Sequence, residues 1–185
     1  MAEINLTKGQ RADVGLRKVS VGLGWDPNSG ISQFEFDLDA SAFLITEGGQ
    51  CPSSGFFVFY NNRVSADGST SSRGDNRGGE GDGDDETLDL DLAKIDPKIE
   101  QVIFAVTIDK ADERKQNFGQ VRNSFIRVYD AGTNEEICKY ELDEDFSTAT
   151  AIEFGRLYKR NGVWRFEATG LPVSGGLGGL AAKYC

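Results

Sequence analysis

The sequence predicts an all-β protein, a two-sheet antiparallel β-sandwich with a few short helices. Three observations favour this class: at least seven short β-like runs lie between turn residues, helical periodicity is scarce, and 23 glycines and four prolines interrupt the 185 residues. Many strands with few helices are typical of two packed sheets. The length fits a single domain, residues 1–185, and neither a repeat nor a linker divides it.

The first expected strand, "FEFDLDA" (34–40), alternates strictly. Its apolar residues share one face, and Glu35, Asp37 and Asp39 share the other. This pattern predicts a half-buried strand with an acidic outer face.

Two further runs are continuously apolar. "FFVFY" (56–60) and "VIFAVTI" (102–108) are bounded by polar residues. Such runs are typical of central strands that are covered on both faces.

The remaining strands form two expected hairpins. The first joins residues 124–130 to residues 137–142 through "AGTNEE". The second joins residues 153–160 to residues 163–169 through "NG", a pair that can adopt the positive φ angles of a type I′ turn. Short helical turns are expected within residues 91–101, within residues 117–123 and after Gly176.

The negative charge is concentrated in one stretch. The whole chain has a formal charge of −10. The stretch from Asp75 to Asp91 contains eight acidic residues and one basic residue, which gives a local charge of −7. A field of this sign repels nucleic-acid phosphates and anionic membranes. The expected first partner is therefore a cation, and nucleic acid is not expected to bind.

Five glycines, at positions 74, 78, 79, 81 and 83, are interleaved with these acids. Glycine permits sharp turns and positive φ, so carboxylates spaced two apart can converge. Calcium takes about six to eight oxygen ligands with loose angular demands, and it suits such a loop better than zinc or copper does. The stretch therefore predicts calcium binding, with a plain solvated acidic loop as the alternative.

Two known calcium loops do not match the stretch. If Asp82, Asp84 and Glu86 occupied the first ligand positions of an EF-hand, Thr87 would fall where glycine is needed. The calcium-binding repeat of parallel β-helices has aspartate where this chain has Gly83, and here it would occur only once.

A second acidic group lies earlier in the sequence. Asp37 and Asp39 share a predicted strand face, and Asp26 ends the "GLGWD" turn. These three carboxylates can contribute to the same metal site as the acidic stretch, or they can simply point into water.

The chain contains no histidine. This excludes Ser/His/Asp and Cys/His catalysis, so no enzyme is expected and any catalysis would rest on carboxylates. Cys51, Cys138 and Cys185 lack CxxC spacing, which argues against a disulfide framework and favours structural thiols. The N-terminal "MAEINLTKGQ" lacks a signal-peptide pattern, and a cytoplasmic location is expected.

Seven motifs occur along the chain: "GLGWD" (22–26), "FDLDAS" (36–41), "FVFYNN" (57–62), "GDNRGGEGDGDDE" (74–86), "QNFGQV" (116–121), "FIRVYD" (125–130) and "FGRLY" (154–158). In this order they resemble the TerD family of tellurium-resistance and stress proteins. The resemblance implies a β-sandwich that binds calcium, with two ions favoured over one ion and several waters. Transferred position by position, it nominates ten metal ligands: Asp26, Asp37, Asp39, Asp75, Asn76, Glu80, Asp82, Asp84, Asp85 and Glu86.

The expected function is a calcium-binding stress-response or tellurite-resistance protein that acts as a calcium-responsive interaction module. Calcium would order the loop and create a surface for other proteins of a stress-response complex. One alternative is a metal-dependent phosphoryl hydrolase, although the only nearby bases for a phosphate clamp are Arg63, Arg73 and Arg77. The other is calcium-dependent docking on a membrane surface, which is less favoured because the loop has few flanking aromatic or basic residues.

Overall fold

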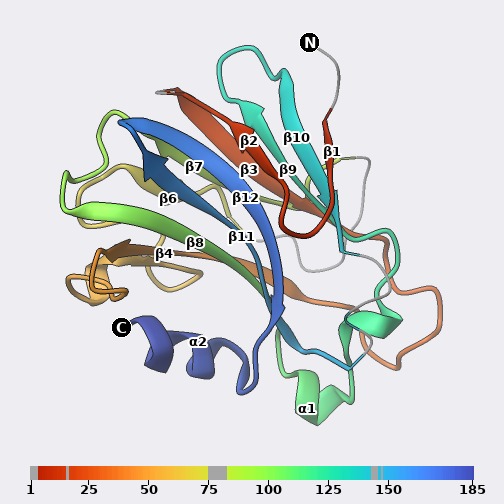
Figure 1. Ribbon diagram of the computed structural model, residues 1–185. Helices are drawn as coiled ribbons and strands as arrows, with labels where there is room; N and C mark the ends of the chain where they lie inside the picture. The colour runs from red at the N-terminus through yellow and green to blue at the C-terminus, as the bar shows by residue number, and fades with distance from the viewer. Residues whose placement is uncertain (1–3, 16, 75–82, 143–145, 147) are drawn as a thin grey trace.

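The computed structural model confirms the predicted sandwich of two sheets (Figure 1). It describes residues 4–15, 17–74, 83–142, 146 and 148–185. Sheet A contains, in spatial order, β1 (Asn5–Leu6), β10 (Glu136–Glu141), β9 (Phe125–Asp130), β3 (Lys18–Gly24), β7 (Glu86–Asp91) and β6 (Thr70–Ser72). Sheet B contains β2 (Arg11–Asp13), β12 (Val163–Pro172), β11 (Ala151–Arg160), β8 (Ile99–Ile108), β4 (Leu38–Thr46) and β5 (Phe57–Val58).

Neighbouring strands are antiparallel, except that β1 runs parallel to β10. Both predicted hairpins are confirmed, as β9–β10 and β11–β12. Asn161 and Gly162 have φ angles of 53° and 76°, as a type I′ turn requires.

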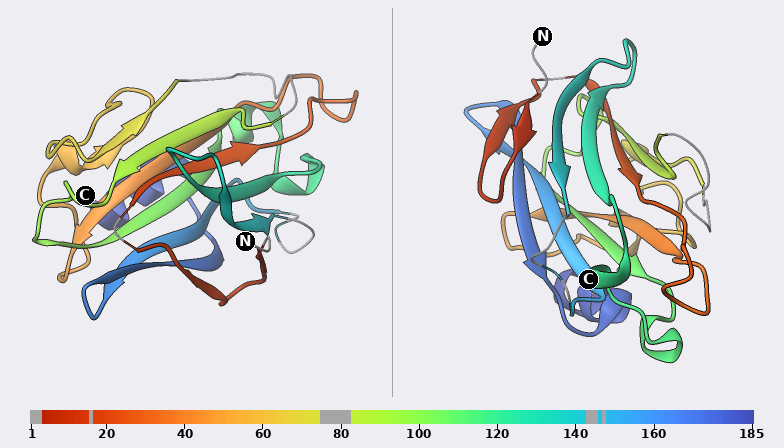
Figure 2. Two further views of the ribbon diagram at one scale, coloured as in Figure 1. Left: turned by 90° about the horizontal axis from the view of Figure 1, so that it is seen from above. Right: turned by 90° about the vertical axis from the view of Figure 1, so that its right-hand side faces the viewer.

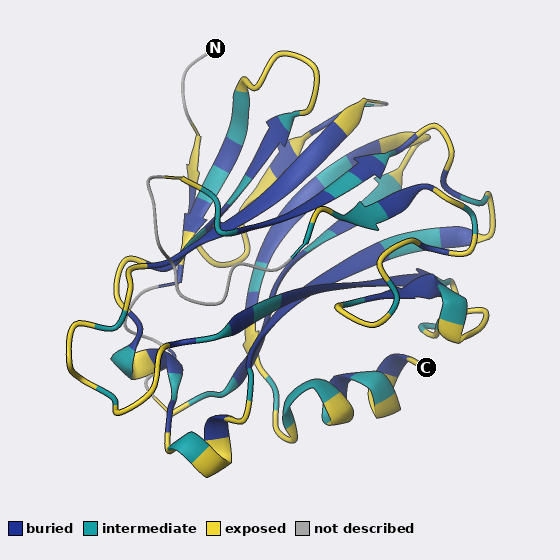
Figure 3. Ribbon diagram, turned by 180° about the vertical axis from the view of Figure 1, so that it is seen from behind, coloured by how far each residue is buried: buried dark blue, intermediate teal, exposed yellow. Residues whose placement is uncertain are grey.

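The core lies between the two sheets, where alternate residues of the strands meet. Sheet A contributes residues such as Val21 and Leu88, and sheet B contributes large side chains such as Phe104, Phe154 and Trp164. Figure 3 shows the buried residues along the strands and the exposed ones mainly in the loops that join them. The predicted central strand over residues 102–108 is confirmed, because β8 lies between β11 and β4.

The predicted central strand over residues 56–60 is wrong in position. Only Phe57 and Val58 form β5, which is the edge strand of sheet B. The run is apolar because both of its faces are nevertheless covered. Val58 packs in the core between the sheets, whereas Phe57 stacks between Phe43 and Phe59 on the outer face, with ring centroids 4.3 Å apart in each pair.

The predicted strand over residues 34–40 begins later, at Leu38. The side chain of Gln116 donates hydrogen bonds of 3.0 and 3.1 Å to the backbone carbonyls of Phe34 and Glu35. The side chain of Gln116 therefore takes the place of a neighbouring strand as hydrogen-bond partner of these two carbonyls. The side chain of Phe34 is exposed.

Four short helices are described: η1 (Ser54–Phe56), α1 (Ala111–Arg114), η2 (Phe118–Gln120) and α2 (Gly176–Tyr184). The turns predicted within residues 117–123 and after Gly176 are confirmed as η2 and α2. The helical turn predicted within residues 91–101 is wrong, because this segment contains the end of β7, a non-helical connection over residues 92–98 and the start of β8. Pro97 disfavours helical backbone at Asp96.

Helix α2 lies outside the sandwich, against the outer face of sheet B (Figures 1 and 2). Leu180 and Tyr184 pack there with Phe43, Ala105 and Ala151. In the described part of the chain, no helix is both long enough and apolar enough to cross a membrane.

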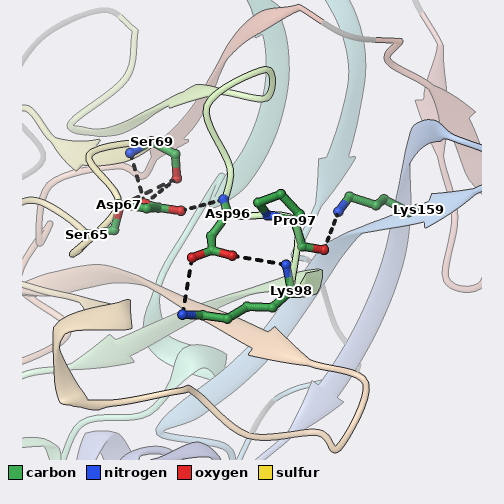
Figure 4. Close-up of polar contacts among 7 residues, drawn as sticks. All are labelled: Ser65, Asp67, Ser69, Asp96, Pro97, Lys98 and Lys159. Atoms are coloured by element: carbon green, nitrogen blue, oxygen red, sulfur yellow. Dashed lines mark hydrogen bonds and ion pairs between the residues drawn. The ribbon is translucent and has the colours of Figure 1, made fainter.

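A partly buried turn around Asp67 connects the loop before β6 to the loop before β8 through hydrogen bonds (Figure 4). One oxygen of Asp67 accepts hydrogen bonds from the Ser65 hydroxyl and from the hydroxyl and backbone N–H of Ser69, at 2.6, 2.8 and 3.0 Å. Its other oxygen accepts a bond of 2.9 Å from the backbone N–H of Asp96. Burial alone would raise the pKa of Asp67, but these hydrogen bonds together lower it.

Replacing Asp67 with asparagine is expected to reduce the free energy of unfolding by about 1–2 kcal/mol at neutral pH, because charged acceptors form the stronger hydrogen bonds. The folded-state pKa is depressed, so this stability is present above the ordinary pKa of about 4 and is lost as the pH falls below it. Urea unfolding at pH 7 and pH 3 tests this. Asp112→Asn, at an exposed position of α1, should have little effect at either pH.

Candidate metal centre

The acidic stretch leads into β7 alongside β3, and two glycines of β3 make room for it. A Cβ atom at Gly22 would lie 2.2 Å from Cγ of Asp84, and one at Gly24 would lie 2.7 Å from the carbonyl oxygen of Gly83. Cβ atoms essentially never make contacts below 3.0 Å, so a side chain at either position would force these neighbouring atoms to shift. The "GLG" of β3 therefore lets residues 83 and 84 lie directly against its backbone.

Asp84 is held by an arginine of the neighbouring strand β9. Nε and Nη2 of Arg127 donate to the two carboxylate oxygens of Asp84 at 2.8 and 2.9 Å. The side chain of Asp84 is 7% exposed and that of Arg127 is 24% exposed. The hydrogen bond from Arg127 to Asp84 is the main reason why the pKa of the arginine is raised. The charge of Asp84 is thus already balanced by a protein cation.

Asp85 and Asp26 lie next to Asp84 at this end of sheet A. The backbone N–H of Trp25 donates to Asp85 at 3.0 Å, and Asp26 accepts a 2.6 Å bond from the side-chain amide of Asn123. Burial raises the pKa of Asp85; the bond from Trp25 opposes this, and repulsion from Asp84 and Asp26 adds to the rise. Asp84 and Asp26 therefore both lie close enough to Asp85 to repel its charge.

Glu86 connects the two sheets. It is the first residue of β7 in sheet A, and its Oε2 accepts a 2.6 Å hydrogen bond from the backbone N–H of Ala40 in sheet B. The residue is only 7% exposed. The pairing of β4 with β5 begins at Ala42, so β5 does not extend as far as Ala40. Glu86 therefore accepts a hydrogen bond from an N–H group of β4 that β5 does not pair with.

Asp39 lies beside Glu86. Both line a cavity of about 10 Å³ together with Arg63, Tyr60 and Gly74. This volume matches about one water-sized sphere. Gly74 immediately precedes the acidic segment 75–82, so the last described residue before that segment lies next to two predicted ligands.

Asp37 lies just before β4 and is not in the lining of this cavity. Its backbone carbonyl accepts a 2.8 Å hydrogen bond from the N–H of Asp109. The strand itself begins one residue later, at Leu38, but the predicted alternation extends to Asp37: Phe36 and Leu38 are buried, whereas Asp37 and Asp39 are partly exposed.

The other four predicted ligands lie outside the described residues: Asp75, Asn76, Glu80 and Asp82. Among the described residues, no group of three or more acidic or cysteine side chains is arranged to hold a metal ion. Five of the six described candidate ligands instead fall into two sets, Asp26 with Asp84 and Asp85, and Asp39 with Glu86. Their donors are all oxygens, as calcium prefers.

The arginines that form ion pairs with these acidic residues were not recognised as their partners from the sequence. Arg73 was considered as a base for a phosphate clamp, but it forms two bonds with Asp89, at 2.6 and 2.8 Å. Ser20 donates to the same carboxylate at 2.6 Å. The signal for Arg127 was its polar position between the buried residues Ile126 and Val128 of β9, which places it on the outer face of sheet A.

Comparisons with known proteins agree with this architecture. The model of the TerD domain family matches residues 1–184. General stress protein 16U of Bacillus subtilis (strain 168) and tellurium resistance protein TerD of Alcaligenes sp are each 46% identical over 186 residues, covering 98% of this chain and 96% of the relative. The crystal structure of a homologue of telluride resistance protein (TerD) from Streptomyces coelicolor A3(2) matches with a TM-score of 0.74 and 26% identity, covering 90% of this chain and 96% of that one.

Proposed function

The chain belongs to the TerD family, and from this premise we propose that it is a calcium-binding protein of the stress response that acts as an interaction module. Relatives of nearly full length are named as tellurium resistance and general stress proteins. The family supports the stress role, and the acidic residues of this chain support the cation.

One observation carries the calcium proposal: the described residues on both sides of the segment 75–82 lie beside carboxylates. Gly74 lines the small cavity with Asp39 and Glu86, and Asp84 and Asp85 follow Gly83 beside Asp26. The segment itself adds three carboxylates and an asparagine amide. This concentration of like charge is unfavourable unless a cation reduces the repulsion.

We assign the ion-holding role to Asp39 and Glu86 in one set, to Asp26 and Asp85 in the other, and to the predicted ligands of residues 75–82. Asp84 supports this arrangement through Arg127, since its two oxygens are already hydrogen-bonded. A bound calcium ion would supply positive charge to these oxygens and so stabilise the loop in one conformation. The interaction surface then depends on calcium.

The contacts of the arginines favour the interaction module over the phosphoryl hydrolase. A phosphate clamp needs guanidinium groups that are available to a substrate. Arg73 is bonded to Asp89 and Arg127 to Asp84. Of the other two arginines considered for a clamp, Arg63 lines the small cavity and Arg77 lies outside the described residues.

The proposal is tested by thermal unfolding and calorimetry of the whole chain in calcium, in magnesium and in chelator. Calcium at a hundred times its dissociation constant should raise the Tm by about 5–10 °C, because such a ligand adds about 2.7 kcal/mol to a domain of this size. Calorimetry gives the number of ions directly. Equal Tm values in calcium and in chelator would refute the proposal. Metal-dependent hydrolysis of a phosphate ester would favour the phosphoryl hydrolase instead.

Two substitutions at Glu86 separate its structural role from its role toward calcium. Glu86→Gln keeps an oxygen for the Ala40 N–H but removes the charge, so the Tm in chelator should change little while calcium affinity falls about tenfold or more. Glu86→Ala also leaves the N–H without its acceptor and should cost about 2 kcal/mol in chelator. Glu113→Gln, exposed on α1, is the control. Wild-type calcium affinity in Glu86→Gln would remove Glu86 from the ligands.

A further inference from the structure

Two cysteines that are far apart in the sequence meet at the end of α2. The sulfur atoms of Cys51 and Cys185 are 2.9 Å apart, although 134 positions separate them. The backbones also meet there, because the N–H of Cys51 donates a 2.7 Å hydrogen bond to the carbonyl of Tyr184. Both thiols are free, and Cys185 is exposed while Cys51 is half-buried. The spacing of the cysteines in the sequence gave no sign of this pair.

The pair joins α2 to the loop that follows β4. Helix α2 is intrinsically weak, since three of its nine residues are glycines. It is held to the outer face of sheet B by Leu180, by the ring of Tyr184 against Phe43 at 5.1 Å, and by an ion pair between Lys183 and Glu153. A covalent bond at its end would fix a helix that otherwise depends on these contacts.

We propose that Cys51 and Cys185 are a site of reversible disulfide formation, through which oxidation clamps α2 onto sheet B. The oxidant is hydrogen peroxide. The sulfur of Cys185, as thiolate, attacks one peroxide oxygen and breaks the O–O bond, giving a sulfenic acid and hydroxide, which takes up a proton to form water. The sulfur of Cys51 then attacks the sulfur of Cys185, and the S–O bond breaks.

The hydroxide leaves with the thiol proton of Cys51 as a second water. Two thiols thus lose two electrons in total, and one peroxide is reduced to two waters. The order of the steps follows from the environment of each thiol. Burial, together with the hydrogen bond and charge of Cys185, raises the pKa of Cys51, so the exposed Cys185 reacts first and its close neighbour resolves it. Because the second step is intramolecular, it is favoured over reaction with another molecule.

The test is peroxide treatment of the whole reduced chain, followed by thiol counting and peptide mapping without reductant. The number of free thiols should fall from three to one, and a peptide pair linked through Cys51 and Cys185 should appear and disappear again with dithiothreitol. Oxidised protein should gain about 5–15 °C in Tm, as expected for a bond that closes a long loop, and α2 amides should exchange more slowly.

Three single variants make the result specific. Cys185→Ser and Cys51→Ser should form no internal disulfide and gain no Tm, whereas Cys138→Ala should respond as the wild type does, because Cys138 lies in the core between the sheets. Three outcomes overturn the proposal: oxidation to sulfinic acid without a linked peptide, linkage only between two molecules, or a 51–185 disulfide that leaves α2 exchange unchanged.

Discussion

Replacing Arg127 with methionine is expected to reduce the free energy of unfolding by about 3–5 kcal/mol. The substitution keeps a long side chain but leaves the carboxylate of Asp84, whose side chain is 7% exposed, without its bidentate partner. Removing one member of a buried ion pair is costly because the other charge stays buried without compensation. Urea or thermal unfolding in chelator measures the effect without any contribution from calcium.

The matched control is Arg165→Met on the outer face of sheet B. Arg165 pairs with Asp13, but the side chain of Asp13 is 69% exposed, so water can replace the arginine. This substitution should cost less than about 1 kcal/mol. In addition, the double variant Asp84→Ala/Arg127→Met should be more stable than Arg127→Met alone, because no buried charge remains. If Arg127→Met costs no more than Arg165→Met, the Asp84–Arg127 pair does not hold the end of the acidic stretch.

Replacing Gly22 with alanine is expected to reduce the free energy of unfolding by about 3 kcal/mol or more. The new methyl group would lie 2.2–2.4 Å from Cγ and both oxygens of Asp84, so this side chain must move and its bonds to Arg127 must break. Overpacking by one carbon typically costs about 1–3 kcal/mol, and here the loss of an ion pair is added. Chemical unfolding and the near-ultraviolet dichroism of the folded state measure the result.

A second variant identifies the cause of this loss. In an Asp84→Ala background the clashing atoms are absent, so Gly22→Ala should cost little more than Asp84→Ala alone; such non-additivity is typical of residues in contact. Gly178→Ala is the control, because a Cβ there meets no atom within 4 Å and alanine favours the helix. If the full cost persists in the Asp84→Ala background, the backbone of β3 requires glycine for a different reason.

These two predictions also bear on the calcium proposal. Arg127 and Gly22 do not contribute oxygen ligands, yet both determine where Asp84 and the neighbouring Asp85 lie. Each variant should therefore weaken calcium binding in proportion to the displacement of Asp85. A variant that loses stability but retains the wild-type affinity for calcium would place the ions away from this end of sheet A.

Local sequence patterns were sufficient for the hairpins and for the central strand β8. The positive φ angles of Asn161 and Gly162 follow from the chemistry of those two residues, and the apolar run of β8 requires burial on both faces wherever the strand lies. The same reasoning was wrong for residues 56–60. Two-sided burial there comes from an edge strand whose outer face is covered by aromatic stacking and α2, and a single segment does not reveal which other element covers it.

The candidate site shows the same division. The sequence by itself determined the fold class and the interleaving of acids with glycines in one stretch, because charge, turn chemistry and hydrophobic alternation act over a few residues. Only the tertiary structure decided that Asp84 is paired with Arg127, that Glu86 reaches Ala40 across the two sheets, and that Cys51 meets Cys185. These contacts join residues 43, 46 and 134 positions apart. Contacts between residues so far apart depend on how whole sheets and helices pack together. Local propensities, which act over a few residues, do not determine that packing.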